Sequence, residues 1–168
     1  MMMNGFKRVI GIAMVAAMTF AMMGCGAAQN ANAAEQEEQM IGLSNPFVDA
    51  DSLEDAAKIA GFDMTAPDSL DGYSGTTIQA IENDLIQVIY GELDHNIYFR
   101  KAVGTEDISG DYNEYEGIKS MSLYGKDLTI KSSGEKTHVI IWNDGQYSYS
   151  IQSNEGFSFG DVQVLLEN

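Results

Sequence analysis

The residues best suited to chemistry lie between Arg100 and Asn113. A basic pair, Arg100 and Lys101, is followed by oxygen-bearing side chains at alternate positions: Asp107, Ser109, Asp111 and Asn113. We expect this stretch to be a loop after a strand, and loops on rigid sheets often carry binding residues. It is therefore the candidate loop for a ligand or partner. The simpler interpretation, which we favour, is that Asp and Ser side chains accept backbone N–H groups in successive turns, with Arg100 or Lys101 balancing their charge.

The alternating oxygens also suggest a calcium loop, but the spacing is wrong for an EF-hand. Counting from Asp107, the sixth position is Tyr112 where glycine is needed, and the twelfth is Ile118 where glutamate is needed. Calcium binding by this loop is therefore the less favoured alternative, and we assign no metal site.

Other catalytic signals are weak. His95 and His138 are the only histidines, and no third ligand stands at metal spacing, so both are expected to be structural, with His138 on the apolar face of a strand. Ser74 does not match a nucleophile elbow, because Thr76 stands two residues later where the second glycine is required, and no glycine-rich phosphate loop is present. We assign no catalytic or cofactor-binding residue and expect a protein that is not an enzyme.

Three aromatic side chains have two interpretations. Trp142, Tyr147 and Tyr149 could form a flat platform for a sugar, since aromatic rings offer rigid contact area. Filling the core beneath a helix is the favoured alternative.

The N-terminus reads as a secretory leader over residues 1–24. Lys7 and Arg8 precede a charge-free run of 15 residues, Val9 to Met23. This run is shorter than the roughly 20 apolar residues that a transmembrane helix needs. Ala21-Met22-Met23-Gly24-Cys25 resembles the bacterial lipobox, which implies cleavage before Cys25 and diacylglycerol and palmitate on that residue. The alternative is an ordinary signal peptide cut near Ala27-Ala28 or Ala33-Ala34.

Composition limits what the mature chain binds. Cys25 is the only cysteine, so no intramolecular disulfide can form. Of nine basic side chains, seven follow Cys25 and face 25 acidic ones, a formal charge of −18. Such a surface repels phosphates, which argues against nucleic acid and against direct adhesion to anionic lipid. Attachment to the membrane is assigned to the lipid on Cys25.

The chain after the leader divides into a tether and one domain. Residues 25–44, the lipidated cysteine and a polar stretch without aromatic residues, are expected to be a flexible tether. Residues 45–168 are expected to form a single α+β domain: one antiparallel meander sheet of about seven strands, packed by an N-terminal helix and a short C-terminal helix. The N-terminal helix is predicted from Asp51 or Ser52 as cap to Gly61. The C-terminal segment 160–166 is predicted as a helix with Asp161 as its cap, and an eighth strand is the less favoured alternative.

Loop chemistry predicts three hairpins. Asn83-Asp84 joins strands 76–81 and 85–90, and residues 96–103 make a further strand. Gly125-Lys126 is expected to set Met121 opposite Ile130. Asp144-Gly145, read as a two-residue loop, sets Trp142 opposite Tyr147.

Three blocks of the domain resemble a known family. They are 67–73 (PDSLDGY), 100–113 (RKAVGTEDISGDYN) and 141–150 (IWNDGQYSYS). They are similar to a domain of unknown function found in clostridial and related Gram-positive lipoproteins and on membrane-anchored regulators. The resemblance implies an extracytoplasmic α+β domain and no known activity or cofactor.

These observations predict a non-enzymatic, lipid-anchored binding or regulatory module on the extracytoplasmic face of the cell membrane. Its partner, an envelope protein or ligand, is unknown. The alternative is a small cell-envelope hydrolase acting on wall polymer or peptide. A concave pocket near His95 or Ser74 holding a carboxylate of raised pKa would favour the hydrolase.

Overall fold

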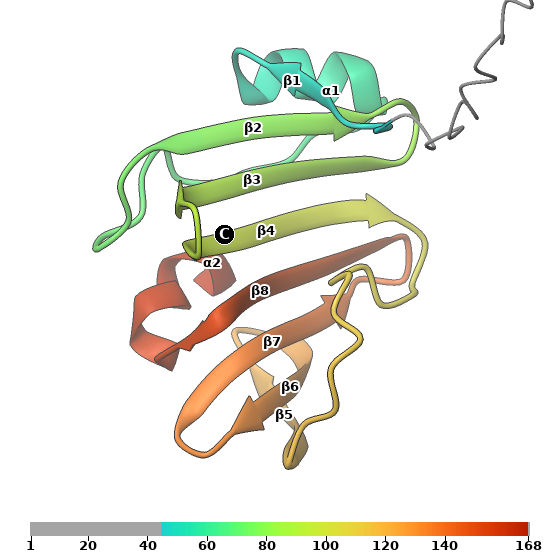
Figure 1. The fold of residues 1–168 in the computed structure, drawn as a ribbon. Helices are drawn as coiled ribbons and strands as arrows, with labels where there is room; N and C mark the ends of the chain where they lie inside the picture. Colours follow the sequence, from blue (N-terminus) through green and yellow to red (C-terminus); the bar gives the residue numbers. More distant parts are fainter. Residues whose placement is uncertain (1–44, 168) are drawn as a thin grey trace, which may run out of the picture. The chain divides into compact units, whose positions relative to one another are not determined.

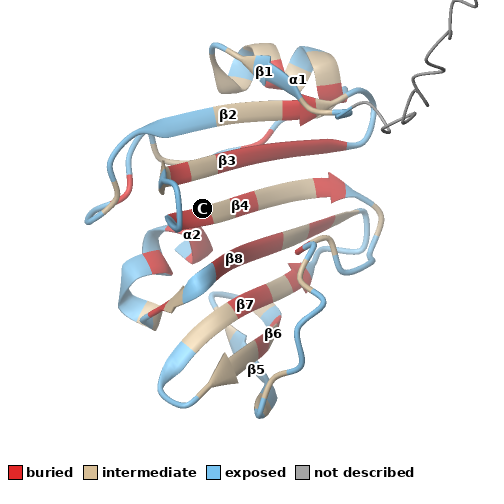
Figure 2. Cartoon of the chain, viewed as in Figure 1, coloured by how far each residue is buried: buried red, intermediate tan, exposed pale blue. Residues whose placement is uncertain are grey.

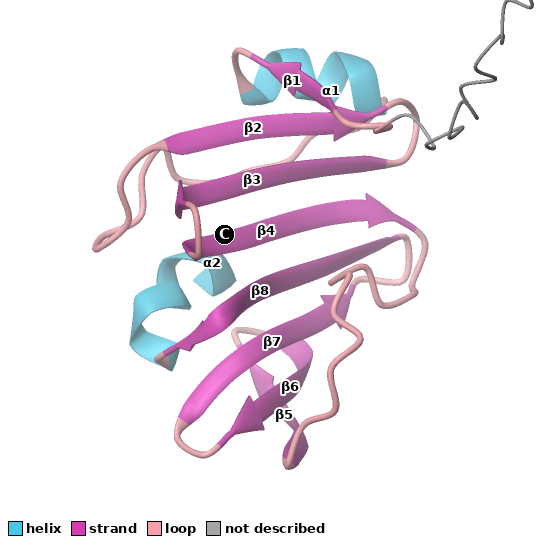
Figure 3. Cartoon of the chain, viewed as in Figure 1, coloured by secondary structure: helices cyan, strands magenta, loops and turns pink. Residues whose placement is uncertain are grey.

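A computed structural model describes residues 45–167, whose centre is one antiparallel sheet of eight strands (Figures 1 and 3). The coarse prediction of an α+β fold built on an antiparallel sheet is confirmed. The elements, in chain order, are β1 (Val48–Ala50), α1 (Leu53–Ala60), β2 (Thr76–Ile81), β3 (Leu85–Glu92), β4 (His95–Val103), β5 (Gly117–Leu123), β6 (Lys126–Ser133), β7 (Lys136–Asn143), β8 (Tyr147–Phe157), the 3-10 turn η1 (Phe159–Val162) and α2 (Gln163–Glu167).

The strand order corrects the predicted meander. The order across the sheet is β1-β2-β3-β4-β8-β7-β6-β5, so β8 pairs with β4 and the chain reaches β5 at the far edge only after a long crossing. That crossing is residues 104–116, which we call the crossing loop. The second half of the sheet is a meander laid down in reverse. β1, which the sequence did not predict, extends the other edge.

The first helix follows the predicted capping. The Ser52 hydroxyl accepts the Asp55 N–H at 3.1 Å, and Gly61 ends the helix in the left-handed conformation at φ 80°. Ala56 and Ala60 are buried. Small side chains at helical spacing let α1 lie close to the sheet, as the sequence predicted.

One face of the sheet is apolar and carries both helices. Its central strands contribute buried side chains that form one cluster with residues of α1, α2 and the 61–75 segment (Figure 2): Ala80, Ile86, Val88, Tyr90, Ile97, Phe99, Leu128, Ile130, Ile140, Trp142 and Ile151. Leu165 and Leu166 of α2 are fully buried in it. We call this the helix face. The opposite face carries polar side chains in its central rows and lies under the crossing loop, and we call it the loop face.

The β2–β3 hairpin is confirmed, with Ile81 opposite Leu85 and Asn83 at φ 55° in the turn. The β5–β6 hairpin differs by two residues. Its loop is Tyr124-Gly125, at φ 51° and 73°, and Met121 lies opposite Leu128. Two successive positive φ values are what a type I′ turn needs, and here a tyrosine takes the first position that Asn or Asp usually holds.

The β7–β8 register also differs by two residues from the prediction. Trp142 pairs with Tyr149, not with Tyr147. The reason lies in Asp144, whose Oδ1 accepts the backbone N–H groups of Gln146 at 2.9 Å and Tyr147 at 2.7 Å and so lengthens the loop. A shift of two keeps each side chain on its face, so both tyrosines still share the helix face with Trp142.

His138 is an exception to the predicted pattern. The pairing of β7 with β8 shifts between Thr137 and Val139, a bulge that breaks the alternation of side chains. The His138 ring lies 5.3 Å from the ring of Tyr115, which follows the crossing loop's turns. The prediction that His138 lies on the apolar face is therefore wrong.

The C-terminal helix is confirmed, with a different start. Asp161 is not its cap. Its Oδ2 accepts the Ser158 N–H at 2.8 Å and so closes the preceding 3-10 turn, after which α2 begins at Gln163.

The predicted leader 1–24, the lipidated Cys25 and the tether up to residue 44 lie outside the described residues. Within 45–167, no helix is both long enough and apolar enough to span a bilayer.

Candidate functional site

The crossing loop lies on the loop face and is held there by Arg100. The Arg100 Nε donates to Gln87 Oε1 at 2.6 Å, and its Nη1 donates to the carbonyl oxygens of Ser109 and, at 3.4 Å, Ile108. Burial lowers the pKa of the guanidinium. Ser148 of β8 also donates to the Glu106 carbonyl. Ser109 is consequently buried at the centre of the loop.

The oxygens of the candidate loop make a series of local turns. Asp107 Oδ1 accepts the Ser109 N–H at 2.9 Å, Ser109 Oγ accepts the Asp111 N–H at 3.3 Å, and Asp111 Oδ1 accepts the Asn113 N–H at 2.8 Å. Each bond spans two residues, as in Asx and Ser/Thr turns. These are the contacts of the simpler interpretation of the loop.

The carboxylates of this loop are already engaged. Lys131 Nζ lies 2.8 Å from Asp107 Oδ2, and the Tyr115 hydroxyl donates to Asp111 Oδ2 at 2.6 Å. Burial opposes ionisation of Asp107, but the hydrogen bonds from Lys131 and Ser109 outweigh it and lower the pKa. No cluster of three or more His, Cys, Asp or Glu residues suited to a metal occurs in the part of the chain that the structure describes.

Lys101 is separated from the rest of the predicted loop site. Neighbouring residues of a strand point to opposite faces, so Arg100 lies under the crossing loop while Lys101 lies on the helix face. Lys101 Nζ donates to the Asp63 carbonyl at 2.6 Å and stands 4.3 Å from the centre of the Tyr147 ring. Phe62 and Tyr149 lie 5.5 Å away. The candidate residues therefore divide between the two faces of the sheet.

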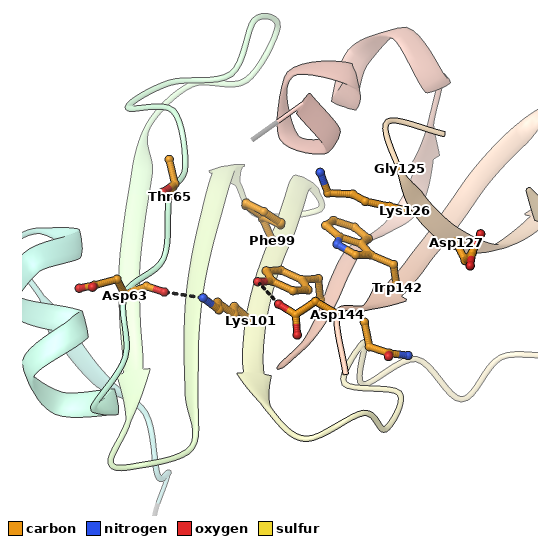
Figure 4. Close-up of a pocket in the computed structure, with 11 residues that line it drawn as sticks. Asp63, Thr65, Phe99, Lys101, Gly125, Lys126, Asp127, Trp142 and Asp144 are labelled. Atoms are coloured by element: carbon orange, nitrogen blue, oxygen red, sulfur yellow. Dashed lines mark hydrogen bonds between the residues drawn. The ribbon is translucent and has the colours of Figure 1, made fainter. Parts of the chain in front are cut away.

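Lys101 forms one wall of a cleft of about 430 Å³ on the helix face (Figure 4). The cleft is lined by three groups of residues: Asp63 and Thr65 after α1, the β5–β6 turn from Gly125 to Asp127, and side chains of β4, β7 and β8 with the turn that joins the last two. Volumes of this order are typical of small-molecule sites.

The inner wall of the cleft is aromatic. The rings of Trp142 and Tyr149 stack with centres 5.1 Å apart and planes 1° apart, and Phe99 lies 6.2 Å from Trp142. Because these rings cover one another's faces, a sugar ring cannot stack flat against Trp142, which is 4% exposed. Trp142 is thus mainly a core residue, as the favoured interpretation had it, and it reaches the cleft with a ring edge.

The other residues singled out in the sequence lie elsewhere. His95 stacks on Tyr73 with ring centres 4.7 Å apart, and its Nδ1 lies 3.2 Å from Glu155 Oε2. Ser74 is exposed in the segment before β2. Neither residue lines the cleft.

In comparisons with known proteins, no family model, no curated protein and no solved structure matches the chain. The resemblance to the lipoprotein domain family stays a prediction.

Sequence reasoning did not foresee the cleft. The sequence marks Trp142 and Lys101 as candidates, but nothing in it links Asp63, Thr65 or Lys126 to a binding site. The one usable clue was strand alternation, which places Lys101 and Arg100 on opposite faces of the sheet.

Proposed function

We propose that this chain is a non-enzymatic binding module, held by a lipid on Cys25 at the extracytoplasmic face of the cell membrane, and that the cleft on the helix face receives its ligand. The anchor rests on the leader sequence alone. The binding role rests on one observation: three segments far apart in sequence converge on a cleft whose cationic wall, Lys101, is already held in place.

The positions of the cleft residues support binding over bond cleavage. Asp144, the carboxylate nearest the aromatic wall, has its pKa lowered by hydrogen bonds from Tyr147 and Gln146 against the effect of burial. It therefore stays ionised and is poorly suited to act as an acid at neutral pH. The hydrolase alternative has less support, since the described carboxyl groups that depart clearly from their usual pKa are all lowered: Asp55, Asp107, Asp111 and Asp144.

The anchor is tested by growing cells with an alkyne-bearing palmitate analogue. We expect label on the wild-type protein and none on Cys25→Ser, and an unlabelled wild type would contradict the anchor.

The binding role is tested by a thermal-shift screen of cell-envelope fragments against the full lipidated protein in detergent. A ligand of the cleft should raise the Tm of the wild type and of Lys119→Gln, but not of Lys101→Gln. Lys119 is a matched control because it is an exposed lysine on β5 of the same sheet. Turnover of a fragment, or no stabilising fragment at all, would refute the proposal.

A further inference from the structure

The side chains that line the cleft indicate which class of ligand it binds, because more of its hydrogen-bond donors than of its acceptors are free to contact a ligand. Two of the seven basic side chains after Cys25, Lys101 and Lys126, line it. Lys101 Nζ has three N–H groups, and the Asp63 carbonyl accepts one of them. Lys126 Nζ donates to the Leu166 carbonyl at 2.9 Å, which ties the far wall of the cleft to α2.

A third donor is the indole of Trp142. Among residues 45–167, nothing accepts a hydrogen bond from its Nε1–H. The nitrogen is also not fully enclosed by protein, unlike Asn96 Oδ1 and Ser150 Oγ, which are buried without a partner. Figure 4 shows this nitrogen on the ring edge that faces the cleft. A tryptophan that is 4% exposed normally finds an acceptor for its N–H, so this one is available to a bound molecule.

The acceptors are, by contrast, engaged or turned away. Both Asp144 oxygens are used: Oδ1 by the two backbone N–H groups of its own loop, Oδ2 by the Tyr149 hydroxyl at 3.2 Å. Asp127 accepts the Ser122 hydroxyl. Figure 4 shows the carboxylates of Asp63 and Asp127 directed away from the cleft. In a strongly acidic protein, this cleft therefore presents mainly donors.

From these positions we infer that the cleft binds a small molecule that carries a carboxylate. Lys101 Nζ donates to the carboxylate, and Trp142 Nε1, beyond the Tyr149 ring, donates to an acceptor on the rest of the molecule, which contacts the aromatic wall. This inference rests on the proposed function and names its ligand class.

A carboxylate suits the cleft better than a phosphate. The Lys101 ammonium matches a single negative charge, while the Lys126 ammonium is already bonded to the Leu166 carbonyl. A dianion would need a second free cation, and it would approach a protein whose overall charge is strongly negative.

The test uses matched pairs of probes on the full lipidated protein in detergent micelles. N-acetylmuramic acid is compared with N-acetylglucosamine, which lacks its carboxylate, and N-acetyl-alanine with its primary amide. Phenyl phosphate serves as the dianion. Trp142 is the only tryptophan in the chain, so its fluorescence reports directly on the proposed contact.

We expect each carboxylate to bind at least about tenfold more tightly than its neutral partner and to shift the tryptophan emission, since a hydrogen bond to a charged group is worth roughly that factor. Lys101→Gln should lose this preference, whereas Lys119→Gln should keep it. Trp142→Phe retains an aromatic ring but lacks the N–H. With the fold checked by circular dichroism, it should bind the carboxylates several-fold more weakly by calorimetry.

Three results would overturn the inference: equal affinity for the acid and neutral members of both pairs, tighter binding of phenyl phosphate, or undiminished binding by Trp142→Phe. If none of these probes binds while the fragment screen finds a neutral ligand that depends on Lys101, the ligand class is wrong and the proposed function stands. If neither experiment finds a ligand, both are refuted.

Discussion

Replacing Arg100 with methionine should release the crossing loop from the sheet without unfolding the strands beneath it. Methionine keeps an unbranched apolar stem of similar reach, so the change removes the guanidinium and little else. Two strong hydrogen bonds disappear, to Gln87 Oε1 and to the Ser109 carbonyl, together with a longer one to Ile108. The contact of the guanidinium with the Tyr98 ring, 5.0 Å to its centre, is lost as well.

The expected loss follows from these contacts. Hydrogen bonds to a charged group contribute about 1.5–3 kcal/mol each. Against them stands the cost of burying the guanidinium, which shows as its lowered pKa. We therefore expect the free energy of unfolding to fall by about 2–4 kcal/mol. The loss cannot grow further once the loop detaches from the sheet, because water then hydrates its carbonyl groups.

Urea unfolding measures the global effect, and hydrogen exchange locates it. The amides of Ser109 and Asp111 should exchange much faster in the variant, while those of β2 and β3 should keep their order of protection. Lys131→Met is the matched control, because it removes only the ion pair with Asp107, whose side chain is 43% exposed, and should cost at most about 1 kcal/mol. An equal loss of stability in both variants, or faster exchange spread evenly over the sheet, would refute the reasoning.

Three further predictions concern the rest of the fold. Gly91→Ala should destabilise the protein by roughly 3 kcal/mol or more, because the new Cβ would lie 2.2 Å from the His95 carbonyl oxygen. Gly104→Ala, at a similar positive φ but in open space, should cost only about 1 kcal/mol. Similar urea midpoints for the two variants would contradict this prediction. Burial and a hydrogen bond to a carboxylate raise the pKa of Tyr115 to about 12 from 10.0, so its contribution to stability is complete below pH 10 and lost between pH 10 and 12; the ultraviolet titration of Tyr115→Phe should lack one late-ionising tyrosine. The hydrogen bond to Glu155 is the main cause of the raised pKa of His95. The contribution of this histidine to stability is therefore complete below pH 6.5 and is lost as the pH rises through the raised value. An NMR titration in which Glu155→Gln leaves the midpoint of His95 unchanged would exclude that cause.

Where the sequence predicted correctly, the signal was local. Ser52 and Gly61 mark the two ends of a helix correctly, because capping involves only residues within one turn. The β2–β3 hairpin was read from Asn83, which adopts positive φ readily. The series of turns from Asp107 to Asn113 likewise uses bonds that span two residues.

The errors of register have a common cause. Tyr124 takes a left-handed conformation that its type does not favour, and the Asp144 side chain, not a glycine, organises the β7–β8 loop. In both hairpins the predicted pairing differs from the observed one by two residues, and a shift of two leaves every side chain on its predicted face. The predicted composition of the helix face therefore survived a wrong pairing, except at the His138 bulge.

The sequence by itself determined the composition of the two faces of the sheet, the capped helix and the acidic charge, because alternation, capping and charge are properties of neighbouring residues. Strand alternation alone also implies that Arg100 and Lys101 serve opposite faces. Only the tertiary structure decided that β8 pairs with β4, which brings Tyr149 beside Lys101, with Trp142 next to Tyr149 on its other side, so that all three line the cleft. Contacts between segments so far apart depend on how the whole sheet closes, and no short stretch of residues encodes that.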